Sequence, residues 1–353
     1  MEFLLVLIIP LVIAIVCFIL FKEISWKEFL IHIAVQLFIT TIFIFIIFYQ
    51  NVYYTEVWNG AVVSKERAEV SCSHSYPCNP HSCNCDKNGC DTCWDTCYTH
   101  SYDVEWRVYD NTKQEWEINT VDSQGLIKPD RWEVVKEGDP TSYTHAYKNY
   151  IKASKQSLFH LHGQLTEKYK KYLPVYPMKI YDYYNLNRVV TVGVKLPNKF
   201  AWNYKLSVIN AKLGKTKQCN AILVLVKDQP EEYYYALGQH WEGGNKNDAI
   251  LVISVDEANT IQWVNVIALV TNNIFNVQLR DSILDIKTLD MEKVLVAFEE
   301  NIEKSFKRKR MRDFDYLMSS ITPSTAQLIT VIIIGTIISI GLSIFFHKDD
   351  TLN

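Results

Sequence analysis

The chain has 353 residues, enough for about two domains of ordinary size, and its 36 basic and 39 acidic side chains give a net charge of −3. A charge so close to zero excludes the broad basic surface of a general nucleic-acid-binding protein, so we expect no nucleic-acid partner. Apolar residues are distributed unevenly and gather in three uncharged runs of the length that a bilayer requires.

These runs predict three transmembrane helices, at residues 4–21, 29–49 and 326–346. The first two are separated only by KEISWKE, so residues 1–50 are predicted to form a helical hairpin. The chain begins without a basic leading segment and without a small-residue cleavage site, so we expect no removal as a signal peptide. Residues 347–353 form a short polar tail.

Small residues recur at every fourth position of the last apolar run, at Gly335, Ser339 and Ser343. Small side chains at this spacing let membrane helices approach one another closely. We predict that this face packs on the helical hairpin or on another copy of the chain.

The distribution of short-loop lysines predicts the orientation in the membrane. Lys22 and Lys27 lie in the hairpin loop and Lys348 lies in the tail, and such charges stay in the cytoplasm. This places residues 51–325 in the periplasm of a bacterial inner membrane. The expected partners are the lipid bilayer and a protein of the envelope or a second copy of the chain.

A basic run precedes the third apolar run and opposes this orientation. Its members are Lys307, Arg308, Lys309, Arg310 and Arg312. These side chains are candidates for contact with anionic lipid headgroups. The alternative is that the run continues the last soluble helix, where positive charge complements the helix C-terminus.

Residues 51–140 predict a small β-rich unit, because strand-like stretches at 52–64 and 102–110 flank a loop-like segment rich in cysteine and histidine. The candidate metal ligands or disulfide partners of this segment are Cys72, His74, Cys78, Cys83, Cys85, Cys90, Cys93, Cys97 and His100. Cys-x-His stands at one end and Cys-x-x-His at the other, so we expect these ends to face each other across a hairpin.

Two chemistries explain this composition. A location outside the cytoplasm favours disulfides, and Cys219 would then make the number of partners even. The interleaved histidines favour zinc, because Cys83-x-Cys85 and Cys90-x-x-Cys93 each supply two adjacent ligands, although soft thiolates also accept copper(I) or an iron–sulfur cluster. Either chemistry would cross-link a unit that is too small to be stabilised by its core alone.

Residues 141–193 are rich in tyrosine and proline and predict a connecting segment that contacts a partner, while residues 317–325 form a linker. His160 and His162 lie in the connecting segment. Their spacing does not place both side chains on one helix face, so we expect no metal site there.

Residues 194–316 predict an α/β domain. The runs at 221–226 and 249–255 are continuously apolar, as in parallel strands covered on both faces, and a helix from Pro230 to Trp241 joins them into a β-α-β core. IQWVNVIALV predicts a third strand. DMEKVLVAFEENIEKSF predicts a final helix with one apolar face.

The order of these elements resembles the TPM domain family over residues 194–314. The motifs are the strand AILVLV, the helix that ends in Gln239-His240-Trp241, the loop GGNKND and the strand AILVISV. The resemblance implies a domain outside the cytoplasm that is often followed by a membrane span, in a family with members described as phosphatases or divalent-ion binders. The whole chain also resembles uncharacterised membrane proteins of tailed bacteriophages.

The candidate divalent-ion ligands are Asp228, Asp248 and Asp256. Asp228 and Asp256 follow the two parallel strands and share the carboxyl edge of the sheet, where open α/β folds bind ligands. Asp248 matches the family's acidic position at the opposite edge. Ala249 replaces the family's usual glycine, and the next strand lacks the usual Gly-x-Gly, so we expect solvated aspartates rather than catalytic ones.

The sequence therefore predicts a membrane protein with three transmembrane helices and an α+β soluble part, made of a Cys-rich β unit and a TPM-like α/β domain. The predicted function is non-enzymatic: an integral envelope protein, encoded by a phage, that binds a partner or modifies the envelope. Two alternatives remain: a metal-dependent phosphohydrolase, and a zinc-stabilised membrane adaptor facing the cytoplasm.

Overall fold

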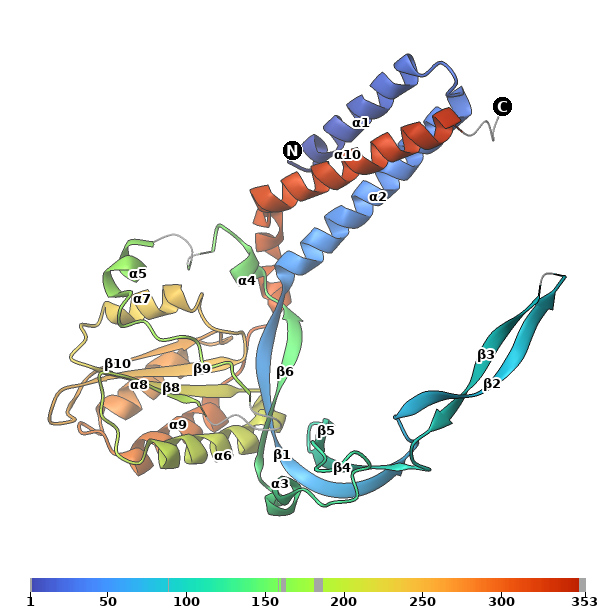
Figure 1. Ribbon diagram of the computed structural model, residues 1–353. Helices are drawn as coiled ribbons and strands as arrows, with labels where there is room; N and C mark the ends of the chain where they lie inside the picture. The colour runs from blue at the N-terminus through green and yellow to red at the C-terminus, as the bar shows by residue number, and fades with distance from the viewer. Residues whose placement is uncertain (1, 88, 158, 160–162, 181–186, 349–353) are drawn as a thin grey trace. The chain divides into compact units, whose positions relative to one another are not determined.

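The computed structural model describes residues 2–87, 89–157, 159, 163–180 and 187–348 (Figure 1). His160 and His162 lie outside the described residues. The chain divides into two compact units. The first consists of Met1–Thr55, Ala146–Lys168 and Arg310–Asn353, and the second of Glu56–His145 and Tyr169–Lys309.

The first unit is made of helices. They are α1 (Glu2–Leu20), α2 (Trp26–Val52), α4 (Tyr150–Ala153), α5 (Gly163–Tyr169), the 3-10 helix η2 (Met311–Ser320) and α10 (Thr325–Lys348). Helices α2 and α10 are each long and apolar enough to cross a membrane. The first predicted span is helical as well, as α1, and packs beside α10 (Figure 1).

Small and polar residues bring the three long helices together. Gly335, Ser339 and Ser343 of α10 are all buried. The Ser339 hydroxyl donates a hydrogen bond to the carbonyl oxygen of Pro10 in α1 at 3.0 Å and lies 3.0 Å from His32 Nε2 of α2. The face predicted to pack closely thus lies against both helices of the hairpin.

Helix α2 contributes a stripe of buried polar residues, one helical turn apart. The stripe consists of Glu28, His32, Gln36 and Thr40. Polar side chains within apolar helices face the interior of a bundle, where they find partners that lipid does not supply. The stripe therefore sets which face of α2 meets the other helices.

Replacing Gly335 by leucine should separate these helices, because a Cβ atom there would lie 2.9 Å from Pro10 Cγ and 3.0 Å from Gln36 Nε2. We expect a loss of about 2 kcal/mol of stability from the overpacking. Gly341→Leu is the matched control, since no atom lies within 4 Å of a Cβ at that position. Thermal unfolding in detergent, followed by circular dichroism, measures the difference. Equal midpoints for the two variants would contradict this packing.

In the second unit, the residues before the α/β part form a four-stranded sheet with the order β5-β4-β1-β6. Its strands are β1 (Tyr53–Val70), β4 (Asp103–Asp110), β5 (Glu115–Ile118) and β6 (Pro140–Lys148), accompanied by the short helix α3 (Asp130–Val134). Its small core includes Val62, Val108 and Trp106, whose ring lies 4.8 Å from that of Trp132. The predicted strand-like stretches on either side of the cysteines are confirmed as β1 and β4.

The cysteine-rich segment itself is not a loop. It folds into an antiparallel hairpin of β2 (Ser75–Asp86) and β3 (Gly89–Tyr98), which follows β1 in the chain and leads into β4. The spacing of the cysteines does not alternate with period two, so the strands were not visible as a sequence pattern.

The α/β part contains a second four-stranded sheet, with the order β10-β9-β8-β7. Its elements are β7 (Val189–Val192), α6 (Lys199–Lys217), β8 (Asn220–Lys227), α7 (Tyr233–His240), β9 (Asp248–Val255), β10 (Ile261–Ala268), α8 (Ile274–Leu284) and α9 (Met291–Ser305). Strands β7, β8 and β9 are parallel, and β10 is antiparallel to β9. The predicted pair of parallel strands is confirmed.

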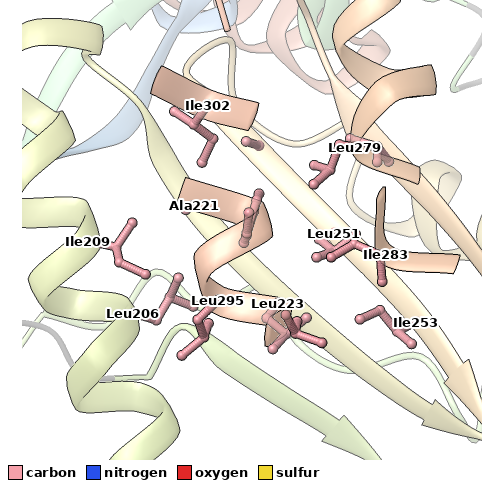
Figure 2. Close-up of a cluster of buried hydrophobic side chains, with 14 of the residues drawn as sticks. Leu206, Ile209, Ala221, Leu223, Leu251, Ile253, Leu279, Ile283, Leu295 and Ile302 are labelled. Carbon is pink, nitrogen blue, oxygen red and sulfur yellow. The ribbon is translucent and has the colours of Figure 1, made fainter. Parts of the chain in front are cut away.

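One face of this sheet carries the main hydrophobic core. Figure 2 shows Leu223 of β8 and Leu251 of β9 facing Leu206 of α6, Leu279 of α8 and Leu295 of α9, all of them buried. Each fully buried aliphatic side chain of this kind contributes about 1.5–3 kcal/mol. This core supports the α/β part independently of the disulfides.

Two helix boundaries differ from the sequence prediction. Helix α7 begins at Tyr233 rather than at Pro230, because the Tyr233 N–H donates to the Pro230 carbonyl and closes a four-residue turn. Helix α9 ends at Ser305, so the basic run does not continue it. Instead, the backbone of Arg308 pairs with Val270 beyond the end of β10.

Candidate functional site

The β2–β3 hairpin has no hydrophobic core. None of the described side chains in its two strands is buried. An isolated two-stranded hairpin is at best marginally stable in water, so this one needs another source of stability.

Three disulfides supply that stability. They join the strands in a ladder, as Cys78–Cys97, Cys83–Cys93 and Cys85–Cys90. Cα atoms lie 5.8 Å apart in the first two pairs and 4.0 Å apart in the third. Six of the nine candidate residues are therefore disulfide partners.

A β-bulge aligns the ladder. Cys83 stands five positions after Cys78, an odd offset that would place the two side chains on opposite faces of a regular strand. Between Cys78 and His81, however, β2 advances by three residues while β3 advances by two, and Asn79 adopts a left-handed φ of 45°. The inserted residue restores a common face, so both cysteines reach β3.

The remaining three candidates, Cys72, His74 and His100, come together at the base of the hairpin with a residue that the sequence did not single out, Asp103. One potential ligand atom from each of the four lies within 4.8 Å of the others. The two chain segments that contribute them, residues 71–74 and 99–102 with the first residue of β4, join the hairpin to the sheet. The predicted meeting of the two Cys–His ends is thus present in the structure.

We call these four residues the junction cluster: Cys72, His74, His100 and Asp103. The signal that could have revealed Asp103 is its position three residues after His100, at the start of a strand.

The geometry within the junction cluster is close. His100 Nδ1 lies 3.1 Å from Asp103 Oδ1 and 3.8 Å from Cys72 Sγ. His74 Nδ1 lies 3.4 Å from the other carboxylate oxygen, Asp103 Oδ2. The Asp103 carboxylate therefore stands between the two imidazoles.

The surroundings keep the Asp103 carboxylate ionised. The Ser73 backbone N–H donates to Asp103 Oδ2 at 2.8 Å, and the Ser73 hydroxyl donates to the same oxygen at 3.1 Å. The backbone hydrogen bond, followed by the contacts with His100 and Cys72, holds the pKa of Asp103 below its usual range. Thiol, imidazole and carboxylate are the donor types that zinc takes in proteins.

Cys219 does not complete the disulfide set. It is a free and fully buried cysteine in the core of the α/β part. Burial raises the pKa of its thiol well above the ordinary value, so it is an unreactive packing residue.

The three candidate aspartates do not converge. Asp228 and Asp256 lie at the carboxyl edge of the sheet, where Asp228 is exposed and Asp256 Oδ1 accepts from the N–H groups of Ala258 and Thr260 in a turn. Asp248 begins β9 at the opposite edge, so it cannot share an ion with Asp228.

Asp248 has a structural environment instead. It is 1 % exposed and accepts hydrogen bonds from Asn220 Nδ2, the Asn245 N–H and the Tyr176 hydroxyl. Tyr176 belongs to the tyrosine-rich connecting segment, and Trp241 Nε1 donates to the Pro174 carbonyl of that segment. The segment predicted to contact a partner thus lies against this chain's own α/β part.

The basic run has mixed surroundings. Arg308 lies 5.7 Å from the centre of the Trp58 ring and 3.4 Å from the buried Glu56 carboxylate. This arginine is engaged within the second unit. The side chains of Lys307, Arg310 and Arg312 are exposed.

Comparisons of the chain with known protein families, with curated proteins and with solved structures give no match. The resemblance to the TPM family rests on the sequence motifs alone. The geometry of the hairpin and its base therefore supplies the structural evidence on function.

Tryptic digestion without reduction should release the hairpin as one cross-linked species. Cleavage after Arg67, Lys87 and Arg107 gives peptides 68–87 and 88–107, and every disulfide of the ladder joins one peptide to the other. Mass spectrometry should find their summed mass less six hydrogens, with one alkylatable thiol, at Cys72. A disulfide within either peptide would contradict this pairing.

Asp248→Asn should destabilise the α/β part by about 2 kcal/mol, because an amide group cannot accept all the hydrogen bonds that the buried carboxylate accepts. The matched change Asp228→Asn, at an exposed site, should alter stability by less than about 0.5 kcal/mol. Denaturant unfolding followed by tryptophan fluorescence compares them. If both variants unfold like the wild type, the structural role of Asp248 is wrong.

Proposed function

We propose that the protein is an integral membrane protein of a bacterial envelope whose second unit lies outside the cytoplasm and uses the disulfide-bonded hairpin to bind a partner protein. The observation that carries this proposal is the ladder of three disulfides in a hairpin without a core. Such disulfides form and persist in oxidising compartments and are rare in the cytosol.

The apolar helices supply the anchor. Helices α2 and α10 have the length and composition of membrane spans. Helix α1 packs against both of them, and we propose that it is the third span. The lysines of the hairpin loop and of the tail favour the cytoplasmic side for those two segments. The second unit then falls on the outer side, in agreement with the compartment that the disulfides require and with the location implied by the TPM resemblance.

The hairpin has the properties of a preorganised binding element. Tyr76, Trp94 and Tyr98 expose 48 %, 56 % and 57 % of their surface on a scaffold held by covalent cross-links. Aromatic side chains on a rigid scaffold give large contact areas at a low cost in conformational entropy. We therefore place the partner contact on these aromatic residues.

The cytoplasmic adaptor is the weaker alternative, because it requires free thiolates where the hairpin has paired cysteines. The phosphohydrolase is weaker as well, because Asp248 lies at the opposite edge of the sheet from Asp228 and Asp256. Encoding by a phage is part of the proposal and is supported by the sequence resemblance alone.

A photo-crosslinking amino acid in place of Trp94 tests the proposal in envelopes of the native host. We expect a discrete adduct from this position and none from Tyr235, an equally exposed aromatic residue of α7. The adduct should be lost when Cys83 and Cys93 are both replaced by serine, because the hairpin is then no longer preorganised. The absence of any adduct from Trp94, or the same adduct from both positions, would contradict hairpin-mediated binding.

A further inference from the structure

The junction cluster lies where the pairing between two antiparallel segments of the chain is interrupted. Strands β1 and β4 pair up to Val70 and Asp103, and β2 and β3 pair from Ser75 and Tyr98 onward. Residues 71–74 and 99–102 between these pairs belong to no strand. The hydrogen bond from the Thr99 N–H to the His74 carbonyl joins the two segments there.

Cys72, which lies at this point, is the one cysteine of the segment without a disulfide partner. Six of the seven cysteines between residues 72 and 97 pair with one another, and Cys72 is left as a free thiol that is only 7 % exposed. A leftover cysteine in an oxidising compartment requires an explanation. Ligation of a metal ion would explain the free cysteine and would also account for the neighbouring histidines.

The donor atoms lie close enough to converge on one ion, since one from each of the four residues lies within 4.8 Å of the others. With metal–ligand bonds of zinc length, two ligand atoms of a tetrahedron lie about 3.3–3.8 Å apart. The measured separations are 3.1 Å for His100 Nδ1 to Asp103 Oδ1, 3.4 Å for His74 Nδ1 to Asp103 Oδ2 and 3.8 Å for Cys72 Sγ to His100 Nδ1. Because the two imidazoles approach different oxygens of the Asp103 carboxylate, small side-chain movements would place one atom from each residue at the corners of a tetrahedron.

Hydrogen bonds from Ser73 also orient the Asp103 carboxylate. Ser73 donates two hydrogen bonds to Asp103 Oδ2, which fixes the plane of the carboxylate toward the imidazoles. Such supporting hydrogen bonds to the ligands are a regular feature of metal sites. They come from the segment that also carries Cys72 and His74.

We propose that the junction cluster binds one zinc ion. Four protein donors fill a tetrahedral coordination shell, so the site is a closed, structural one rather than a catalytic one with an open position. On binding, the Cys72 thiol releases its proton to solvent and ligates as the thiolate. The ion cross-links the two segments of the junction and fixes the hairpin on the sheet, in addition to the disulfides within the hairpin.

Metal binding to the full chain, purified in detergent with its disulfides intact, tests this inference. Titration with Zn²⁺ against a chromogenic chelator should give one zinc per chain. Titration with Co²⁺ should give the visible absorption of a tetrahedral site together with a thiolate charge-transfer band. Bound zinc should also protect Cys72 from alkylation and slow amide exchange at Thr99.

His100→Ala should weaken zinc binding at least tenfold, and Cys72→Ser should abolish the charge-transfer band. His81→Ala is the matched control, since His81 lies on the same hairpin outside the junction cluster, 3.7 Å from Asp95; it should bind zinc like the wild type. Tryptic mapping of the disulfides in each variant shows that the hairpin still forms.

The inference is overturned if the wild type takes up no zinc, if Cys72→Ser and His100→Ala bind it like the wild type, or if His81→Ala loses as much affinity as His100→Ala. None of these outcomes bears on the membrane location or on partner binding, because the photo-crosslinking test reads the hairpin's aromatic residues without added metal.

Discussion

The structure of the cysteine-rich segment depends on covalent cross-linking in place of a hydrophobic core. Strands β2 and β3 bury none of their described side chains, so burial does not offset the entropy of ordering them. The disulfides reduce that entropy loss by restricting the unfolded chain. The α/β part is stabilised by packing instead, since strands β8 and β9 are buried almost throughout and one face of the sheet carries the main core (Figure 2).

This constraint links the fold to the proposed location. Disulfides of the kind that join β2 and β3 persist in oxidising compartments, and the same chain carries two helices that are long and apolar enough to cross a membrane. Both features are explained if the helices cross an inner membrane with the second unit outside. The hairpin then presents rigid aromatic side chains, and the junction cluster sets how firmly the hairpin is held on the sheet.

Much of the architecture is readable from sequence, because it depends on composition and period. The apolar runs become α1, α2 and α10, and AILVLV and AILVISV become β8 and β9. The disulfide pairing is not readable, since it depends on a bulge at Asn79 that no composition rule marks. Helix α8 was missed although Phe275, Leu279 and Ile283 recur every fourth residue, because no strong start or stop signal brackets them. Asp103 was missed because Ser73 and His74 are distant from it in sequence, even though His100 stands three residues before it and the matching Cys–His ends indicated the place.

The location of the second unit is the central claim, and antibody access to a short epitope inserted beside Gly138 tests it most directly. Gly138 is an exposed turn residue with no atom within 4 Å of a Cβ position, so it offers room for an epitope in the full chain. A second epitope is placed after the C-terminal residue. The account predicts that antibody binds the first epitope on intact spheroplasts and the second only after permeabilisation. Binding to the Gly138 epitope only after permeabilisation would contradict the account.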